Sequence, residues 1–277
     1  MSTDSEALEQ TRTGAAAGLR VSAVDKVFDT RRGRLEALRG VDLSIGQGEF
    51  VAVLGRSGCS KTTLLRILGG LLAPTRGTVE AGGRSIRRPD GSRDDRVLSD
   101  VGMVFQDPNL FPWYTVADNV ALPLKLRGVG RLERRKRADE LCERFGLGGF
   151  AAAYPRELSG GMRQRAALAR AVSCDPSVLL MDEPFGALDA VTRDRMDLEL
   201  QGLHAAAGAT TVFVTHSIPE AVLLADRVVL LTARPGRVRS IVEVPLARPR
   251  SIEVETSAQF ANAVRTLRRL LNEDGQR

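Results

Sequence analysis

The residues with the clearest chemical potential lie in one short stretch, Gly55 to Thr62, which reads Gly-Arg-Ser-Gly-Cys-Ser-Lys-Thr. A valine-rich apolar run, Phe50 to Leu54, precedes it, and a helical pattern begins at Thr63. A buried strand, a glycine-containing loop, a lysine and a hydroxyl residue at a helix start are typical of a phosphate-binding loop. In such loops, backbone N–H groups point at the bound polyphosphate. We therefore expect nucleotide phosphates to bind here.

Within this loop, Lys61 is expected to reach the β- and γ-phosphates, and the Thr62 hydroxyl is expected to hold Mg²⁺. The residues expected to contact the nucleotide are Gly55, Arg56, Ser57, Gly58, Cys59, Ser60, Lys61, Thr62 and Thr63. One position departs from the pattern, because Ser60 stands where a glycine is expected. Serine costs about 1–2 kcal/mol there if the backbone is left-handed, and little if it is already helical. A strand–helix turn with a chance lysine is the alternative, and the motifs downstream disfavour it.

Two acidic residues follow a second buried strand. The apolar run Val178 to Met181 leads directly into Asp182 and Glu183. Asp182 is expected to hold Mg²⁺ through water, and Glu183 is expected to polarise the attacking water as a general base. Burying two carboxylates at a strand end without a nearby cation or a catalytic role costs free energy, which disfavours a purely structural role.

Two more strands end in polar side chains, Gln106 after Val101 to Phe105 and His216 after Thr211 to Thr215. In open α/β sheets, ligands bind beyond the carboxyl ends of the strands. We therefore expect Gln106 to reach Mg²⁺ or a water molecule and His216 to take part in catalysis. An ordinary polar strand terminus is the alternative for each. The other histidine, His204, is expected to be exposed in a helix–turn segment.

A second helix start also suits an anion. Ser159 is a good N-cap, and Gly160 and Gly161 leave backbone N–H groups accessible before a helix expected from Ala166 to Ser173. One chain rarely needs two phosphate-binding helix starts for one nucleotide. A head-to-tail dimer explains the pair, with each ATP between the phosphate loop of one copy and Ser159–Gly161 of the other. A simple capped helix is the alternative.

Composition narrows the class of protein. The chain has 277 residues, of which 43% are hydrophobic, enough to bury a large core. Its net charge of +6 suits an anionic ligand or membrane face, and equally an ordinary solvated surface. No stripe of aromatic and basic residues favours nucleic acid as a partner. Three scattered cysteines fit a reducing compartment without a metal site made from them.

Along the chain, residues 1–18 are polar and small and are expected to form a disordered tail. They lack the apolar segment of a signal peptide. No apolar run reaches about 18 residues, so we expect an intracellular, soluble chain whose membrane role needs a partner. Residues 86–100 are expected to be a solvated insertion.

The connector Pro108–Thr115 holds Trp113, the single tryptophan, and suits either a protein-docking groove or packing within the helical part. Residues 244–277 form an extension with an amphipathic helix, which either docks on this chain or serves a partner; the residues on its apolar face are Phe260, Val264, Leu267 and Leu271.

Taken together, these motifs resemble the ATP-binding subunit of ABC transporters over about residues 19–243. The matching stretches are Gly55–Thr62, Gln106, Leu158–Met162, Leu180–Glu183, Ala187–Asp189 and His216. The resemblance implies an α/β P-loop NTPase with a RecA-like core, an antiparallel β subdomain and a helical subdomain inserted at about residues 107–164. It also implies that Phe28 stacks on adenine, with a core phenylalanine as the alternative.

Shorter stretches resemble the nitrate, sulfonate and taurine importers more narrowly; they are Leu110–Trp113, Tyr154–Arg165, Thr215–Ala221 and Arg234–Arg237. This narrower resemblance implies an ATPase that uses Mg²⁺ and forms a homodimer on a membrane permease, at the cytoplasmic face. An extracytoplasmic solute-binding protein would deliver the solute. Two alternatives stay open: a subunit that binds nucleotide but hydrolyses it poorly because of Ser60, and a soluble ABC ATPase outside transport. A P-loop kinase would explain neither Leu158–Met162 nor His216.

Overall fold

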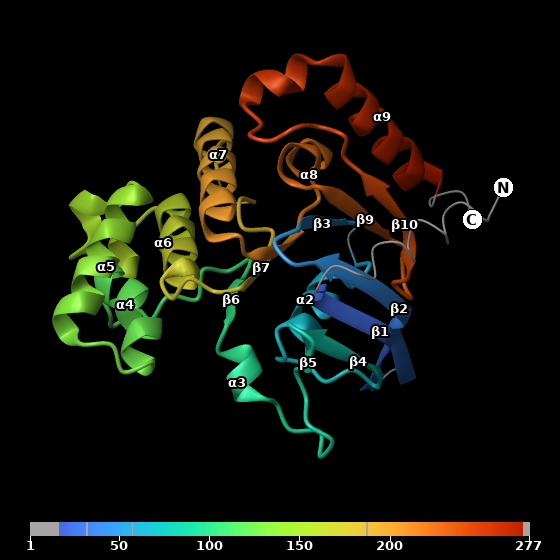
Figure 1. Cartoon of the computed structure of the whole chain (residues 1–277), viewed down its shortest axis with the longest axis horizontal. Helices are drawn as coiled ribbons and strands as arrows, with labels where there is room; N and C mark the ends of the chain where they lie inside the picture. Colours follow the sequence, from blue (N-terminus) through green and yellow to red (C-terminus); the bar gives the residue numbers. More distant parts are fainter. Residues whose placement is uncertain (1–16, 32, 57, 187, 274–277) are drawn as a thin grey trace.

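The computed structural model describes residues 17–31, 33–56, 58–186 and 188–273. In this part of the chain, strands form a six-stranded sheet of order β10-β9-β3-β8-β7-β6 and a four-stranded sheet of order β2-β1-β4-β5. Helices surround the six-stranded sheet, and a helical group stands apart from the four-stranded sheet (Figure 1). The predicted α/β class, with an antiparallel sheet and a helical part beside a parallel core, is confirmed.

The six-stranded sheet forms the core and is parallel except at one edge. Its parallel strands are β3 (Phe50–Leu54), β6 (Val101–Val104), β7 (Val178–Asp182), β8 (Thr210–Val214) and β9 (Arg227–Leu231). Strand β10 (Val238–Glu243) pairs antiparallel with β9. Every residue of β3, β7 and β8 is buried, as expected for parallel strands covered on both faces. The carboxyl ends of these strands therefore lie at one edge of the sheet.

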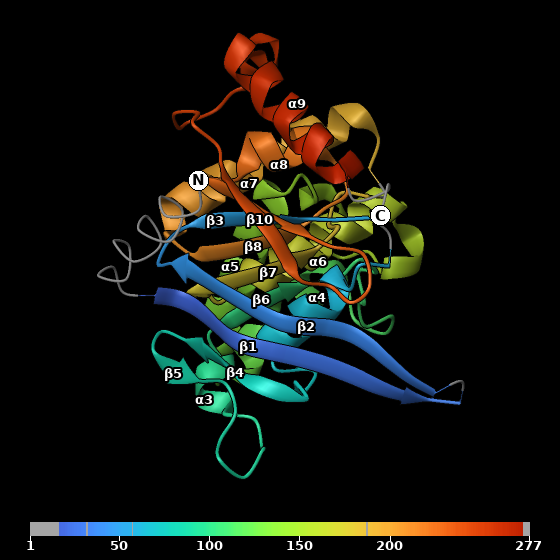
Figure 2. The ribbon, with the colours of Figure 1, turned by 90° about the vertical axis from the view of Figure 1, so that its right-hand side faces the viewer.

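The antiparallel sheet is built from β1 (Ala17–Thr30), β2 (Gly33–Gly46), β4 (Arg76–Ala81) and the short β5 (Arg84–Ser85). The long β1–β2 hairpin extends well beyond the other strands (Figure 2). Leu19 and Val21 of β1 are buried in one hydrophobic cluster with Val51 and Val53 of β3, which fixes this sheet against the core sheet. Most of the tail predicted for residues 1–18 lies outside the described residues, but Ala17 and Gly18 belong to β1.

Helix α2 (Lys61–Leu68) follows β3 directly and packs against β7 and β8. The helical group consists of α4 (Val116–Leu126), α5 (Arg131–Arg144) and α6 (Gly160–Val172), with short 3₁₀ turns at Gly148–Phe150 and Pro155–Glu157. Val120, Leu141 and Phe145 are fully or nearly fully buried within it. The boundaries expected near residues 107 and 164 stay predictions, and α6 continues past the second of them.

The remaining helices are α7 (Ala190–Ala207), α8 (Ile218–Leu224) and α9 (Ala258–Asn272), with a 3₁₀ turn at Ile252–Thr256. Phe260 and Leu267 of α9 are buried, and α9 packs on α8 (Figure 1). The amphipathic helix is thus docked on this chain. The buried Arg250 guanidinium adds to this attachment by donating to the carbonyl oxygens of Val222, Leu223 and Ala225 at the end of α8. None of the described helices is long and apolar enough to cross a membrane.

Two sequence expectations about exposure are wrong. His204 is buried, with its ring edge-on to Phe50 at a centroid distance of 5.1 Å and its Nδ1 3.2 Å from Thr211 Oγ1. This burial lowers the pKa of His204. In the segment expected to be a solvated insertion, Ile86 and Val97 are buried, and α3 (Asp95–Leu98) interrupts the irregular chain. Both segments contain many polar residues, so the sequence pattern did not indicate that Ile86, Val97 and His204 are buried.

Candidate active site

The phosphate loop connects β3 to α2 at the carboxyl edge of the parallel strands. Lys61, the first residue of α2, is only 7% exposed, and its Nζ donates to the Gly55 carbonyl oxygen at 2.9 Å. Gly55 has no room for a side chain, because a Cβ would lie 2.5 Å from Cys59 Sγ. The ammonium group is therefore folded back across a tight loop by a hydrogen bond that a phosphate oxygen could replace.

Ser60 is the N-cap of α2 and has a left-handed backbone, with φ 72° and ψ 24°. Its side chain makes no capping hydrogen bond, and Gly58 in the same loop has φ +82°. The left-handed region costs a residue with a Cβ about 1–2 kcal/mol. Of the two backbone conformations considered for Ser60, the structure has the strained one. Elsewhere in the loop, Cys59 is buried, Arg56 is exposed and Thr63 is half-buried, while Ser57 lies outside the described residues.

Thr62 and Asp182 come together beneath the loop. The Thr62 hydroxyl donates to Asp182 Oδ1 at 3.2 Å, and Asp182 is the last residue of β7. Burial raises the pKa of Asp182, while the Thr62 hydrogen bond and the positive charges of Arg66 and Lys61 oppose that rise. A cation at this point would therefore stabilise a carboxylate that burial penalises.

This pair of ligands fits Mg²⁺ better than a transition metal. No group of three or more His, Cys, Asp or Glu side chains in the described part of the chain could hold a metal ion. Mg²⁺ prefers oxygen atoms and is commonly bound by one or two carboxylates, with phosphate and water completing its shell. The hydroxyl of Thr62 and the carboxylate of Asp182 supply such oxygen atoms.

Glu183 faces a different neighbour from Asp182. Its Oε2 lies 3.1 Å from Nδ1 of His216, which stands two residues beyond β8. The Glu183 backbone has φ +45°, and its N–H donates to the Val214 carbonyl oxygen at 2.9 Å. This backbone turn lets two consecutive acidic residues reach different partners, one toward the phosphate loop and one toward His216.

Gln106 lies two residues beyond the end of β6 rather than directly at its end, and its side chain is exposed. Gln164 of α6 donates from Nε2 to the Phe105 carbonyl oxygen at 3.1 Å, which ties the segment before Gln106 to the helical group. Contact of Gln106 with a metal ion stays a prediction. Phe28 is half-buried in β1 and belongs to neither buried hydrophobic cluster. Lys26 Nζ lies 4.9 Å from the Phe28 ring centroid, and adenine stacking also stays a prediction.

The second helix start has the expected cap but an earlier beginning. Ser159 Oγ accepts a hydrogen bond from the Met162 N–H at 3.2 Å, as an N-cap does. Helix α6 begins at Gly160, so the start expected at Ala166 is wrong; the two glycines are part of the first turn. Ser159 is exposed. A Cβ at Gly160 would meet only the Arg163 guanidinium, at 3.9 Å, so there is open space at this position.

Sequence reasoning missed a buried set of side chains next to His216. The Thr215 hydroxyl donates to Glu220 Oε2, and Arg193 Nε lies 3.4 Å from Glu220 Oε1. Arg193 also donates from Nη2 to the Leu188 carbonyl oxygen at 3.0 Å. These contacts join α7, which Asp189 caps, to the segment that carries His216. The one indication of these contacts in the sequence was an acidic residue, Glu220, four positions after His216.

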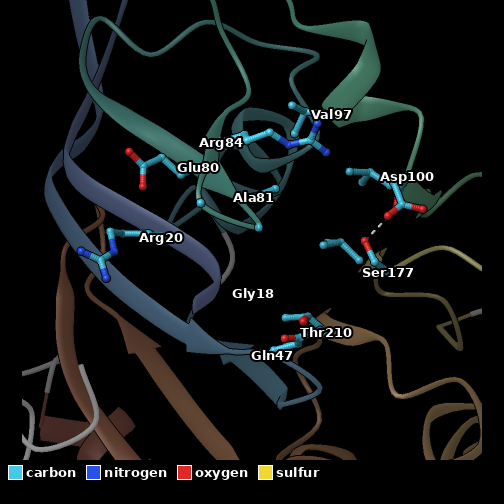
Figure 3. Close-up of a pocket in the computed structure, with 14 residues that line it drawn as sticks. Gly18, Arg20, Gln47, Glu80, Ala81, Arg84, Val97, Asp100, Ser177 and Thr210 are labelled. Atoms are coloured by element: carbon cyan, nitrogen blue, oxygen red, sulfur yellow. Dashed lines mark hydrogen bonds between the residues drawn. The ribbon is translucent and has the colours of Figure 1, made fainter. Parts of the chain in front are cut away.

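A cavity of about 470 Å³ lies elsewhere, at the opposite edge of the core sheet (Figure 3). The first residues of β6, β7 and β8 line it, together with Arg84 of β5 and the Asp100 segment. None of the residues predicted to act on the nucleotide lines this cavity. The predicted chemistry is therefore gathered at the carboxyl edge, away from this hollow.

Comparison with known proteins identifies the family of this chain. An ABC transporter family model matches residues 38–186. An uncharacterized ABC transporter ATP-binding protein of Methanocaldococcus jannaschii is 44% identical, over 92% of each chain. The taurine import ATP-binding protein TauB of Burkholderia pseudomallei is 46% identical over 81% of this chain and 84% of its own length. The nitrate import ATP-binding protein NrtD of a Synechocystis strain is 43% identical over 82% of this chain and 83% of its own length.

A solved structure of an ATP-binding cassette has a similar fold. The dimeric post-hydrolysis ATP-binding cassette MJ0796, bound to ADP and Pi, superposes with a TM-score of 0.75 at 34% identity. The superposition covers 83% of this chain and all of that one. The chain therefore belongs to the ABC transporter family, as one of its ATPase subunits.

Proposed function

We propose that this chain hydrolyses ATP to drive the import of a small solute, of the taurine or nitrate kind, through a membrane permease. The observation that carries the proposal is the meeting of two side-chain pairs at the end of β7. Thr62 lies 3.2 Å from Asp182, and His216 lies 3.1 Å from Glu183, the next residue. The import function rests on the similarity to TauB and NrtD rather than on the site.

In this proposal the triphosphate lies against the phosphate loop. The backbone N–H groups and Lys61 bind the phosphate oxygens, and Phe28 stacks on the adenine. Thr62, Asp182 and Gln106 are the residues that would hold Mg²⁺. When bound, the ion neutralises charge on the phosphates. The chain itself supplies the positioning of the nucleotide and the removal of a proton from water.

Glu183 is the proposed general base, which orients the attacking water and accepts its proton. His216 is the proposed partner that keeps the Glu183 carboxylate in place through the 3.1 Å contact. Arg193 and Glu220 support the segment that carries His216, because Thr215 bonds to Glu220. Hydrolysis therefore depends on groups from β7, β8 and α8 that meet at one sheet edge.

The complete site is proposed to need a second copy of the chain. Exposed Ser159 and half-buried Gly160 and Gly161 form a capped helix start that one nucleotide in the same subunit does not require. In a head-to-tail dimer, this element would contact the phosphates held by the partner. The dimeric state of the similar cassette MJ0796 supports this arrangement.

An exposed aromatic cluster is the proposed permease contact. Trp113 is 66% exposed and lies 5.5 Å from Phe111 between ring centroids, with Tyr114 beside both. Buried Asn119 holds this loop by accepting from the Phe111 N–H at 2.8 Å and donating to the carbonyl oxygens of Phe111 and Tyr114. A fixed loop that presents a bare tryptophan suits docking better than internal packing. The chain would then lie at the cytoplasmic face of the membrane, and an extracytoplasmic protein would deliver the solute.

The test is reconstitution with a permease and a solute-binding protein of the taurine or nitrate import kind. Vesicles that contain the permease and this chain, with the solute-binding protein outside, are expected to take up solute only with ATP and Mg²⁺ in the compartment that holds this chain. Taurine, nitrate and an aliphatic sulfonate are the solutes to compare. ATP hydrolysis without uptake of any solute would contradict the transport function, and uptake independent of Glu183 would contradict the proposed site.

A further inference from the structure

The hairpin between β9 and β10 touches the phosphate loop at two points. Arg234 donates from Nε to the Gly58 carbonyl oxygen at 2.8 Å. Gly236 packs so closely that a Cβ there would lie 2.5 Å from the Cys59 carbonyl oxygen. The contact joins residues 176 positions apart in the chain, at the loop that the sequence assigns to phosphate binding.

The hairpin is held in place without help from the loop. The Gly236 N–H donates to the Ala37 carbonyl oxygen at 2.8 Å, and the Arg39 N–H donates to the Gly236 carbonyl oxygen at 3.1 Å. Inside the hairpin, the Thr232 hydroxyl donates to the Pro235 carbonyl oxygen at 2.8 Å and accepts from the Arg237 N–H at 3.0 Å. Arg234 therefore reaches the phosphate loop from a support anchored on β2 and β9.

The Gly58 carbonyl belongs to the peptide unit that also carries the Cys59 N–H. That N–H donates to the Arg56 carbonyl oxygen at 3.1 Å, so both polar groups of this peptide are held in the present structure. Gly58, at φ +82°, stands directly before this peptide, and Ser60, at φ 72°, lies one residue beyond Cys59. The loop thus contains one strained residue, Ser60, and Arg234 gives the neighbouring Gly58 carbonyl a charged contact from outside the loop.

We propose that Arg234 is a positioning residue for nucleotide binding, which keeps the Gly58 carbonyl turned toward its guanidinium and the loop shaped for phosphate. This inference rests on the proposed binding of nucleotide phosphates by Gly55–Thr62. A carbonyl oxygen that rotated toward the phosphates would repel them, and ordering the loop at the moment of binding would weaken affinity. A guanidinium is always charged, and its hydrogen bond to a carbonyl is stronger than a neutral one.

The test measures equilibrium binding of ATP, ADP and adenosine to the isolated full chain with Mg²⁺ present. Arg234→Gln is expected to weaken ATP and ADP binding about tenfold, the loss of one charge-assisted hydrogen bond, and to leave adenosine unchanged. Arg237→Gln is the matched control, because Arg237 lies on the same hairpin, is exposed, and bonds within it through its backbone. Equal affinities in Arg234→Gln and the parent, or equal losses in both variants, would overturn the proposal.

Two further variants separate position from charge. Gly236→Ala keeps the Arg234 charge but pushes the hairpin from the Cys59 carbonyl, so it should weaken ATP binding as Arg234→Gln does. Arg234→Lys keeps the charge and loses the planar Nε donor, so it should also weaken binding. Full affinity in both variants would mean that only charge matters and would reject a positioning role. Thermal unfolding of each variant identifies loss of fold, and if Gly236→Ala unfolds the comparison rests on Arg234→Lys.

Lys61→Ala separates failure of this inference from failure of the proposed function. If Lys61→Ala leaves ATP affinity unchanged, the loop does not bind the phosphates, and both proposals fail. If Lys61→Ala weakens ATP binding while Arg234→Gln does not, the inference about Arg234 alone is wrong.

Discussion

His216 Nδ1 lies 3.1 Å from Glu183 Oε2, across the neighbouring ends of β8 and β7. His216 is 67% exposed on its side chain, so the contact sits at the mouth of the site rather than in the core. The neighbouring Asp182 turns instead to Thr62. Two adjacent carboxylates thus have separate partners, which is what a division between metal binding and proton transfer requires.

Glu183→Gln is predicted to abolish turnover while ATP still binds. The amide keeps the shape of the side chain and its contact with His216 but cannot accept a proton from water. General-base catalysis contributes roughly 10²–10⁴-fold, so kcat should fall by at least about 100-fold. Steady-state hydrolysis and equilibrium binding of ATP check this together. Turnover within about threefold of the parent, a barrier change under roughly 1 kcal/mol, would show that Glu183 is not the base.

Ser159→Arg is predicted to leave ATP binding by the single chain intact and to destroy hydrolysis, because Ser159 is proposed to contact the nucleotide held by the other copy. Mixing Ser159→Arg chains with Lys61→Ala chains tests the sharing. In the mixed dimer one composite site carries both damaged elements and the other carries neither. About half of the parent hydrolysis per dimer is then the upper limit. Absence of hydrolysis in the mixed dimer would argue against shared sites, because without sharing each chain would carry one damaged element.

Trp113→Ala is predicted to weaken co-purification with the permease more than it weakens ATP binding. Trp113 is exposed, so its removal takes little buried area from this chain, whereas it would remove a large aromatic anchor from an interface. Leu132→Ala is a matched control, because Leu132 is also exposed and lies on α5 away from the aromatic cluster. Equal loss of permease binding in both variants would contradict a specific dock.

Asp197→Asn is predicted to make stability less dependent on pH. Burial raises the pKa of Asp197 to about 8, and the carboxylates of Glu220, Asp194 and Glu255 add to the rise while Arg193 opposes it. The folded chain therefore binds a proton at Asp197 that the unfolded chain releases above its ordinary pKa of 3.8. The contribution of Asp197 to the free energy of unfolding is fully present below pH 3.8 and is lost as the pH rises toward about 8.

Urea unfolding at pH 5, 6, 7 and 8 checks this prediction. The difference in free energy of unfolding between parent and Asp197→Asn should grow in favour of the variant as the pH rises. Asp194→Asn is a control on the neighbouring turn of α7 that removes only one of the charges facing Asp197. If the stability of the parent changes with pH in the same way as that of the variant, Asp197 is ionised over the whole range and the prediction is wrong.

The sequence predicted the strands and the residues at their ends, because parallel strands place every carboxyl end at one edge of the sheet. Asp182, Glu183 and His216 follow from that rule, and Thr62 follows from the phosphate-loop pattern. The contacts of Arg234 and Glu220 did not follow, because they depend on how the β9–β10 hairpin and α8 fold back onto the site. His204 was misjudged for a similar reason: its burial comes from Phe50, far away in the sequence.

The last prediction concerns Ser60, whose left-handed backbone the sequence could only pose as one of two alternatives. Ser60→Gly is predicted to raise the affinity for ATP and the rate of hydrolysis, because glycine adopts φ 72° without the steric penalty of a Cβ. The relieved strain amounts to at most about 1–2 kcal/mol in the folded loop, and in folding stability the greater freedom of glycine in the unfolded chain offsets part of it. The measurement is kcat and KM for ATP in the parent and the variant.

Ser60→Ala separates the backbone from the hydroxyl group. Alanine keeps the Cβ, so a backbone effect predicts that Ser60→Ala resembles the parent and differs from Ser60→Gly. If alanine instead behaves like glycine, the serine hydroxyl crowds the phosphates and the backbone strain is unimportant. The intact Lys61, Asp182 and Glu183 argue that the parent retains turnover, so identical kinetic constants in all three chains would show that this loop tolerates serine freely.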